Sequence, residues 1–355
     1  MASEKLYLRP VGLLYGASAE IAIAEELALP LAGGPIAFAA AEMIEGTPQN
    51  SRRRIFTAQA LGHSSDSDLA TLVEKVTAKR PPFAGLLLEH PVLMGIVNVT
   101  PDSFSDGGLY DTKEEAISHA AELAAAGAAI VDIGGESTRP GADPVEEQEE
   151  AQRVLPVIEG VSGLPAIISV DTRKASVARE AAKKGAKILN DVSALTHDPE
   201  CLGVAVGSGM SLVLMHAQGE PKTMQENPHY DDVVLEVFDY LEARIGAAVG
   251  AGIDRSRIAA DPGLGFGKTL EHNLALLAHT SLYHGLGVPL LIGASRKRFI
   301  QGVCGGSEPH ARESGSQAAA LAAAAQGAQI LRVHDVASAR QALAVWRASI
   351  FGTEN

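Results

Sequence analysis

Residues that could bind or polarise a substrate recur at regular intervals between positions 92 and 335 of this 355-residue chain. Each follows a short aliphatic run, a pattern typical of the carboxyl end of a buried β-strand. In chain order they are Asn98, Asp132 with Glu136, Asp171, Asn190 with Asp191, His216, Asp261, Ser295 with Arg296 and Lys297, and Arg332 with His334. One such residue is more often a helix cap or a turn residue, whereas a full series of polar strand ends indicates a functional site.

The acidic and amide members of this set are suited to a flat heteroaromatic ring. An ionised carboxylate such as Asp171 or Asp261 accepts two N–H donors, and the amide of Asn190 both donates and accepts hydrogen bonds. The pattern therefore predicts a ligand ring with several N–H groups and at least one acceptor.

The cationic members are suited to an anion, and Lys297, Arg332 and His334 together favour a phosphate group. No triplet of His, Asp and Glu has the spacing of a zinc or dinuclear site, so a metal ion would be shared with the substrate. Magnesium is commonly held by one or two protein oxygens and several phosphate oxygens. Asn98 is the candidate for that protein oxygen.

Two long loops follow the first two predicted strands. Their sequences are TPDSFSDGG at 100–108 and GGESTRPGA at 134–142. Gly, Ser and Pro are also the residues of ordinary turns. Phe104 and Arg139 are poor choices for a bare turn, and loops on a rigid scaffold commonly carry function, so we assign both loops to the site.

From residue 92 onward, eight aliphatic runs alternate with helical segments, many of them Ala-rich, which predicts eight βα units. The predicted strands are residues 92–100, 128–136, 166–172, 187–193, 211–216, 257–263, 289–295 and 329–335. The predicted helices include residues 113–127, 144–160, 175–185 and 233–252. This alternation over about 260 residues is typical of a (β/α)8 TIM barrel. A doubly wound open sheet is disfavoured, because no GxGxxG opens the first helix and polar residues follow nearly every strand.

Two segments of the barrel region receive local interpretations. Asp143, Pro144 and Glu146 predict an N-cap, a first helical residue and a capping acid, so the acidic run at 146–150 is interpreted as exposed helix surface. The segment at 305–316 is interpreted as a solvated loop after the seventh strand.

Residues 1–88 do not follow the alternation and are predicted to form a small N-terminal α/β extension before a barrel domain at 89–355. Its candidate elements are strands at 6–16 and 33–43, a helix or strand at 21–29 and a helix at 66–80 that ends before Pro81 and Pro82. Three adjacent arginines, Arg52 to Arg54, are interpreted as a solvated loop rather than a binding site. The extension could cover the bottom of the barrel, contribute to a dimer interface, or do neither.

The composition, with 46% hydrophobic and 20% charged residues, is that of a folded globular protein. Lys and Arg total 29 against 43 Asp and Glu, and the net charge of −14 disfavours nucleic acid and anionic membranes as partners. Cys201 and Cys304 are expected to be reduced thiols. Neither a signal peptide nor a membrane span is recognisable, so we expect a cytoplasmic protein.

Eight segments of the chain resemble, in order, the motifs of the dihydropteroate synthase family. They are MGIVNVTPDSFSDGG (94–108), VDIGGESTRPGA (131–142), ISVDTRK (168–174), ILNDVSAL (188–195), LMHAQGEPKTMQENPHYDDV (214–233), DPGLGFGK (261–268), IGASRKRFI (292–300) and LRVHDV (331–336). The similarity spans residues 92–350 and includes every predicted strand, which makes it highly specific. It implies a (β/α)8 barrel that joins 4-aminobenzoate to (7,8-dihydropterin-6-yl)methyl diphosphate and releases diphosphate in a Mg²⁺-dependent step of folate synthesis.

The resemblance also implies which residues contact each part of the substrates. The pterin would be bound by Asp171, Asn190, Met215, Asp261, Phe266, Gly293, Lys297 and Arg332. The diphosphate would be bound by Asn98, Thr138, Arg332 and His334, with Asn98 also holding Mg²⁺. The aminobenzoate would be bound by Phe104, Thr138, Arg139, Pro140, Ser295 and Lys297. The catalytic residues would be Asp171, Lys297, Arg332 and His334.

In the implied reaction the carbon–oxygen bond at the pterin methylene ionises and the arylamine then attacks, without a general base. The resemblance further implies a homodimer and, from Phe104, Pro140 and Ser295, sensitivity to sulfonamides. One alternative is a methyltetrahydrofolate-dependent corrinoid methyltransferase, which the motifs STRPGA, SRKR and RVHD disfavour. The other is a catalytically silent pterin-binding barrel, which the retained polar strand ends disfavour.

Overall fold

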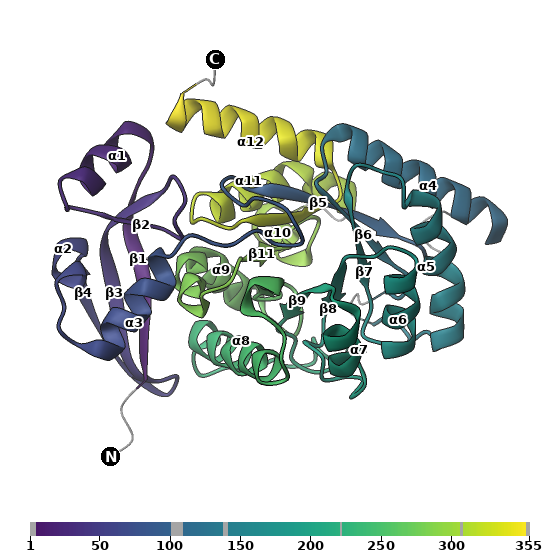
Figure 1. Cartoon of the computed structure of the whole chain (residues 1–355), viewed down its shortest axis with the longest axis horizontal. Coiled ribbons are helices and arrows are strands. Elements are labelled where there is room, and N and C mark those ends of the chain that lie inside the picture. Colours follow the sequence, from purple (N-terminus) through teal and green to yellow (C-terminus); the bar gives the residue numbers. More distant parts are fainter. Residues whose placement is uncertain (1–4, 101–108, 138–140, 221, 306–307, 353–355) are drawn as a thin grey trace.

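The computed structural model describes residues 5–100, 109–137, 141–220, 222–305 and 308–352 (Figure 1). Within these residues an eight-stranded parallel sheet occupies the centre of the larger part of the molecule. Its strands are β5 (Val92–Asn98), β6 (Ile130–Gly134), β7 (Ile167–Asp171), β8 (Ile188–Asp191), β9 (Ser211–Met215), β10 (Ile258–Asp261), β11 (Leu291–Ile292) and β12 (Ile330–Val333). All eight predicted strands are thereby confirmed, each one to five residues shorter than predicted.

The strand order shows that the sheet is a barrel. Strands β5 to β10 pair in chain order, and β12 pairs with both β5 and β11. A parallel bridge between Ala260 and Leu290 joins β10 to the start of β11 and closes the cylinder. The prediction of a (β/α)8 barrel is correct, because an open doubly wound sheet would leave two unpaired edges.

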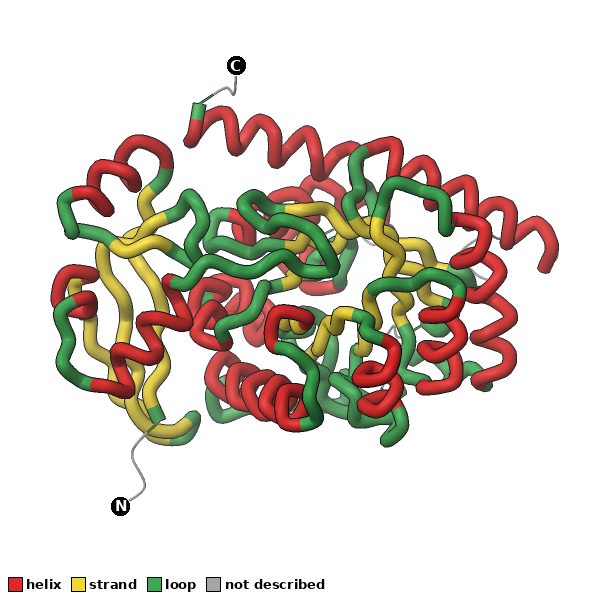
Figure 2. Tube along the Cα trace, viewed as in Figure 1, coloured by secondary structure: helices red, strands yellow, loops and turns green. Residues whose placement is uncertain are grey.

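Helices surround the barrel, as Figure 2 shows in red around the yellow strands. They are α4 (Leu109–Ala126), α5 (Glu147–Val161), α6 (Ala175–Lys183), α7 (Cys201–Ser208), α8 (Val233–Gly250), α9 (Leu270–Ala278), α10 (Arg298–Cys304), α11 (Glu313–Ala324) and α12 (Val336–Phe351). Short 3-10 helices lie at Arg255–Arg257, Thr280–Leu286 and Pro309–Arg312. The segment at 305–316 is therefore not entirely a loop, since it contains the last of these turns and the start of α11.

The start of α5 differs from the prediction in two respects. The helix begins at Glu147, with Glu146 as its N-cap, because the Val145 N–H donates to Glu136 Oε1 at 3.1 Å and holds the preceding chain extended. The prediction of a helix from Pro144 was wrong for this reason. Glu150 is fully buried and pairs with the ammonium of Lys174, so the acidic run is not entirely exposed surface.

The chain just before the barrel closes its amino-terminal end. Phe83 is fully buried and packs into a cluster that contains aliphatic side chains from the barrel strands, among them Met94, Ile130 and Ile330. These residues lie in the first halves of their strands, so the ring fills the bottom of the barrel, opposite the carboxyl ends. Part of the N-terminal sequence therefore does cover the barrel bottom.

The remaining N-terminal residues form a separate antiparallel sheet beside the barrel (Figure 1). Its elements are β1 (Leu6–Leu14), α1 (Gly16–Ala24), β2 (Leu29–Pro30), β3 (Ala37–Thr47), β4 (Asn50–Thr57), α2 (Ala58–Gly62) and α3 (Ser67–Thr77). The sheet is fixed to α8, because Tyr7 donates to Asp239 at 2.9 Å and Arg53 pairs with Asp232 at 2.9 Å. Arg52 to Arg54 thus lie in strand β4, not in a loop as predicted.

Two further features of the described chain bear on the sequence predictions. Cys201 is a buried free thiol and Cys304 is an exposed free thiol, so neither forms a disulfide. No helix among the described residues is long and apolar enough to span a bilayer.

Candidate active site

Parallel register brings four polar or small residues to one level at the carboxyl end of the barrel. Asn98 is the register partner of Gly134, Gly134 of Asp171, and Asp171 of Asn190. These positions come from four adjacent strands, β5 to β8, so residues that are far apart in the sequence lie close together in the barrel. The glycine leaves room between its two neighbours, since a Cβ there would lie 3.3 Å from the Cβ of Asp171.

Arg332 is the cation around which the site is assembled. Its Nε donates to Asp132 Oδ2 at 2.7 Å and its Nη2 donates to Asp171 Oδ2 at 2.8 Å. The Asn190 amide donates to the same Oδ2 of Asp132 at 3.0 Å. One network therefore connects strands β6, β7, β8 and β12 across the barrel mouth. Burial opposes the charge of Arg332, but the two carboxylates raise the pKa of its guanidinium above the ordinary value.

The pKa of the Asp171 carboxyl group is raised, as is common at sites of acid–base or electrostatic catalysis. Burial raises the pKa of Asp171 to about 8, against the opposing effect of Arg332, and the negative charge of Asp132 adds to the rise. A carboxyl group with this pKa changes its ionisation within the working pH range. The network is thus poised to respond when a ligand adds or removes charge beside it.

A second group of predicted residues lies at the ends of β10 and β11. Lys297 is the N-cap of α10, and its Nζ donates to the carbonyl oxygen of Leu264 and lies 4.5 Å from the centre of the Phe266 ring. Burial lowers the pKa of Lys297 to about 8, although Asp261 opposes this. Burial raises the pKa of Asp261, although Lys297 opposes this in turn. The two groups therefore stabilise each other's charged form.

Gly293 lies between the Arg332 network and the pair of Lys297 and Asp261. It has no side chain, so it leaves space between these two groups. A Cβ at this position would lie 3.8 Å from the Cβ of Arg332 and 3.9 Å from Oδ2 of Asp261. Met215 is the register partner of Asp261 and is buried beside it. The structure therefore brings together all eight residues that the resemblance assigns to the pterin, as two connected groups at one end of the barrel.

The residues expected to contact the phosphates and the aminobenzoate are only partly described. Ser295 and His334 lie side by side, with the hydroxyl 3.0 Å from Nδ1 of the imidazole and 3.3 Å from the His334 backbone N–H. Phe104, Thr138, Arg139 and Pro140 lie outside the described residues.

The backbone between Ser295 and Lys297 is held in an unusual conformation. Arg296 has φ of +58°, a left-handed value that is costly for a residue with a side chain. Its N–H donates to Ser316 Oγ at 2.9 Å, and its carbonyl oxygen accepts from Arg312 at 3.0 Å. These contacts from the start of α11 hold a turn that places both flanking side chains at the site.

Sequence reasoning did not assign Asp132 to the site, although it recognised the residue as a strand end. The signal was present, because Asp132 is an acidic residue within an otherwise aliphatic run, but the structure places it in the middle of β6 and not at the strand end, where Asp171 lies in β7. Asp132 is fully buried and accepts hydrogen bonds from both Arg332 and Asn190, which gives it a central place in the network.

Arg173 is a second residue that the sequence did not single out. Its guanidinium contacts Glu136 at 3.2 Å, His197 at 3.4 Å and Glu220 at 3.2 Å. These four residues belong to four consecutive βα loops, so Arg173 connects the loops that surround the site. Only the folded barrel places the four loops together, and no local sequence pattern reports it.

The donor set at the strand ends bears on whether a metal ion could bind. Among the described residues no group of three or more His, Cys, Asp or Glu side chains is arranged to hold one. Asn98 offers a single amide oxygen at the end of β5. This set does not suit a metal held by protein alone, but it does suit Mg²⁺ that takes most of its ligands from a bound diphosphate and water.

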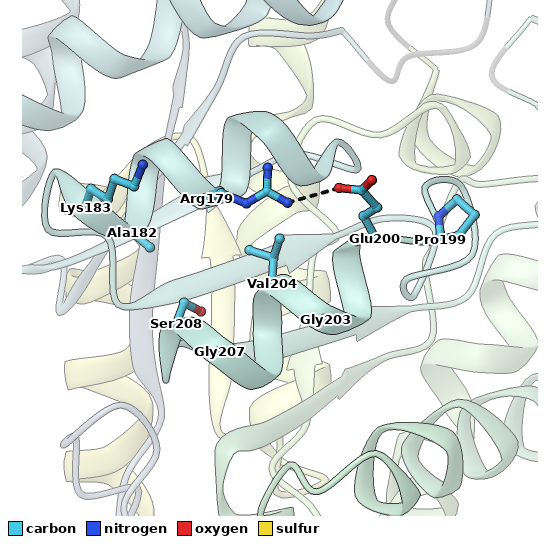
Figure 3. Close-up of a pocket in the computed structure, with 9 residues that line it drawn as sticks. All are labelled: Arg179, Ala182, Lys183, Pro199, Glu200, Gly203, Val204, Gly207 and Ser208. Carbon is cyan, nitrogen blue, oxygen red and sulfur yellow. Dashed lines mark hydrogen bonds and ion pairs between the residues drawn. The ribbon is translucent and has the colours of Figure 1, made fainter.

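A groove on the outer wall of the barrel lies apart from this site. It has a volume of about 620 Å³ and runs between α6 and α7, where Arg179 pairs with Glu200 at 3.0 Å (Figure 3). None of the residues assigned above lines it. The strand ends, not this groove, carry the residues with the chemistry of a substrate site.

Comparisons with known proteins identify the family of the chain. Residues 94–334 match the family described as pterin binding enzyme. Dihydropteroate synthase of Escherichia coli strain K12 is 49% identical over 269 residues, which cover 76% of this chain and 95% of the relative.

Solved structures give the same result. The structure of Xanthomonas albilineans dihydropteroate synthase with 4-aminobenzoic acid has a TM-score of 0.71 and 51% identity, covering 75% of this chain and 96% of that chain. The Burkholderia cenocepacia dihydropteroate synthase complexed with 7,8-dihydropteroate has a TM-score of 0.67 and 42% identity, covering 74% and 93%. The chain therefore belongs to the pterin binding enzyme family, within the group that contains the dihydropteroate synthases.

Proposed function

We propose that this protein is a dihydropteroate synthase, a transferase that joins 4-aminobenzoate to (7,8-dihydropterin-6-yl)methyl diphosphate and releases diphosphate. The observation that carries the proposal is the network of Arg332 with Asp132, Asp171 and Asn190 at the carboxyl end of the barrel. It offers carboxylate and amide groups for the N–H and carbonyl edge of a pterin, beside a cation for a phosphate. A relative whose structure holds 4-aminobenzoic acid supports the second substrate.

The carboxylates and amide bind and orient the pterin. Asp171, Asn190 and Asp261 are buried or nearly so, which makes each hydrogen bond to the ring specific, because an analogue without the matching group leaves a buried polar atom unpaired. Phe266 and Met215 provide apolar walls. The flat guanidinium of Arg332 is suited to stacking on the ring while it faces the phosphate.

The reaction requires charge stabilisation more than proton transfer. Ionisation of the carbon–oxygen bond leaves positive charge on the pterin and negative charge on the departing diphosphate. Ionised Asp171 beside the ring favours the first charge. Arg332, Lys297 and His334 favour the second. The arylamine is a free nucleophile near neutral pH, so its attack on the methylene carbon needs no general base.

Mg²⁺ fits this site as a substrate-borne ion. We propose that Asn98 supplies one protein oxygen to it, in agreement with the single-oxygen donor set at the end of β5. When bound, the ion would neutralise charge on the diphosphate leaving group. Thr138 is proposed as a further diphosphate contact, and Phe104, Thr138, Arg139 and Pro140 with Ser295 and Lys297 as the aminobenzoate contacts.

The two alternative functions are less well supported. A corrinoid methyltransferase would share the pterin site, but the relatives with about half of their residues identical are named dihydropteroate synthases. A silent barrel would not need the buried charges that the network retains at a cost in stability.

The test is diphosphate release from the purified protein given the pterin diphosphate, Mg²⁺ and 4-aminobenzoate, each omitted in turn. Release should match formation of dihydropteroate, require all three components, and fall at least about 100-fold in Lys297→Ala. Lys183→Ala is the matched control, because Lys183 is an exposed lysine of α6 that pairs with Glu180. Pterin binding without turnover would contradict the synthase and direct the work to a corrinoid-binding assay.

Three further properties are proposed with the synthase. The protein would be cytoplasmic. It would also be a homodimer, as the family resemblance implies, and light scattering on the purified protein measures its mass. It would be inhibited by sulfonamides in competition with 4-aminobenzoate, because these drugs copy the aminobenzoate. The solved structure of a Yersinia pestis relative with a sulfonamide drug supports this expectation.

A further inference from the structure

A buried lysine beside the site has no place in the reaction described above. Lys268 is 3% exposed and follows the loop that carries Phe266. Its Nζ lies 2.9 Å from Nδ1 of His216, 2.9 Å from the carbonyl oxygen of Phe266 and 3.3 Å from the carbonyl oxygen of His216. A buried amine that contacts carbonyls and an imidazole, rather than a carboxylate, costs stability, and such a cost is commonly retained where it serves function.

The three contacts define the state of the neighbouring histidine. The Lys268 amine donates to the carbonyl oxygens of Phe266 and His216, and it lies 2.9 Å from Nδ1 of His216, where the direction of the hydrogen bond is set by the tautomer of the imidazole. Burial and the charge of Lys268 both lower the pKa of His216 well below its ordinary value. The edge of the Tyr240 ring packs on the imidazole with ring centres 4.9 Å apart. His216 is therefore a fixed, neutral contact of Lys268 rather than a titrating base.

The loop that Lys268 holds is the one that supports Lys297. Within it, the carbonyl oxygen of Leu264 accepts from the Lys297 amine, and the Phe266 ring lies 4.5 Å from that amine. Gly263 has φ of +69° and passes so close to β9 that a Cβ there would lie 1.9 Å from the His216 carbonyl oxygen. Lys268 thus connects the Phe266 peptide to the end of β9 at the point of closest approach.

Other contacts hold the rest of this loop. The Tyr230 hydroxyl donates to the Gly267 carbonyl oxygen at 2.8 Å, and Asn273 Oδ1 accepts from the Gly265 N–H at 2.6 Å. Loss of the Lys268 amine would therefore release the Phe266 peptide without freeing the whole loop. The expected consequence is a displaced ring and a misdirected Lys297, rather than an unfolded protein.

We propose that Lys268 is a positioning residue, which together with neutral His216 fixes the Phe266 loop so that the Lys297 amine faces the pterin and its leaving group. The proposal rests on the function proposed above, because it assigns Lys268 an effect on the pterin site through Phe266 and Lys297. Lys268 itself need not touch substrate.

The test is a double-mutant cycle on Lys268→Met and Lys297→Met, with Lys183→Met as the control. Methionine keeps the length and apolar stem of lysine and removes only the amine. Each single variant should lower kcat/KM for the pterin diphosphate roughly 10- to 100-fold, since small displacements at a catalytic site have effects of this size. The double variant should be within about threefold of Lys297→Met alone, because coupled residues are not additive. Lys183→Met should equal the wild type.

A binding measurement distinguishes a failure of the positioning role from a failure of the proposed synthase activity. The wild type and the same single and double variants are compared for their affinity for 6-hydroxymethyl-7,8-dihydropterin by calorimetry, which needs no turnover. A wild type that binds this pterin but does not release diphosphate removes the synthase and leaves the cycle intact. An active wild type in which the two substitutions multiply, or in which Lys268→Met lowers only the melting temperature, overturns the positioning role. Lys268→Gln, which keeps an N–H donor for the Phe266 carbonyl, should recover part of the lost rate.

The wild-type protein provides a test that does not depend on a folded variant. In the ring ¹⁵N spectra of the wild-type protein, His216 should show one protonated and one unprotonated nitrogen near neutral pH, as a neutral imidazole does. An imidazolium would contradict the packing of a neutral His216 against Lys268 and with it the proposal.

Discussion

Replacing Arg332 by methionine removes the one cation that two buried carboxylates share. Asp132 is fully buried and Asp171 is 14% exposed at its side chain, and each accepts a hydrogen bond from the guanidinium. Removing one partner of a buried ion pair costs about 3–5 kcal/mol, because it leaves an uncompensated charge in a weakly polar interior. The unfolding entropy of a barrel of this size is about 0.56 kcal/mol/K, at about 2.1 cal/mol/K per residue, so the melting temperature should fall by roughly 5–9 °C. Diphosphate release should be abolished.

The destabilisation should also depend on pH, with a definite sign. In the unfolded chain both carboxyl groups are ionised above about pH 5. In the native state burial already raises the pKa of Asp171 to about 8, and loss of Arg332 removes the group that opposed this rise. The folded variant therefore binds more protons than the unfolded chain over a wider pH range, and its stability falls as pH rises through that range. The deficit relative to the wild type should grow as the pH rises above about 7 and through the wild-type pKa of about 8, because there the wild type loses the proton of Asp171 and the variant keeps it.

The assay is thermal unfolding of the two proteins at a series of pH values, with Arg179→Met as the matched control. Arg179 also pairs with a carboxylate, Glu200, but the pair is exposed and should contribute about 0–1 kcal/mol. A second substitution, Asp132→Asn, should restore part of the stability lost in Arg332→Met. Equal losses in the two arginine variants, or a deficit that shrinks as pH rises, would refute the assignment of Arg332 as the shared cation.

Three other predictions follow from described contacts. The log of kcat/KM against pH should be bell-shaped with a maximum near 8, because Asp171 acts ionised and Lys297 acts protonated. Burial brings the pKa of each group to about 8. Initial rates from about pH 6 to about pH 10 measure the profile, and a flat profile would contradict these roles. In denaturant unfolding, Arg296→Gly should be more stable than Arg296→Val by roughly 1–2 kcal/mol. Both variants lose the arginine side chain, but only valine is strained at φ of +58°. Equal stability of the two variants would argue against a strained turn. Phe83→Ala should cost about 3–5 kcal/mol by emptying the bottom of the barrel, and a cost below about 1 kcal/mol would mean that the ring does not fill it.

Local sequence carried most of the information about the barrel. Alternation of aliphatic runs with helical segments predicted all eight strands, because each parallel strand is buried on both faces and reads as a continuous apolar run. Gly127 and Gly185, the last residues of two predicted helices, have the positive φ that is common just after a helix end. Predictions failed where a distant residue decided the outcome, as at α5, whose start depends on the contact between Glu136 and Val145.

Asp171, Asn190 and Asp261 could be named from the sequence because each lies at the end of a strand, and strand ends of a barrel meet at one face. Met215, Phe266 and Gly293 were expected only from the resemblance to the family. Which of them touch was decided only by register and closure of the barrel. Asp132 and Arg332 are 200 positions apart, yet their side chains are 2.7 Å apart, since β12 pairs with β5 and so lies two strands from β6. The pairing of β9 with β10 brings Lys268 against His216, and burial displaces the pKa values of Asp171 and Lys297 toward one another. Residue type and strand position are local properties that a sequence records, whereas contact, burial and ionisation depend on the surroundings that the folded barrel supplies.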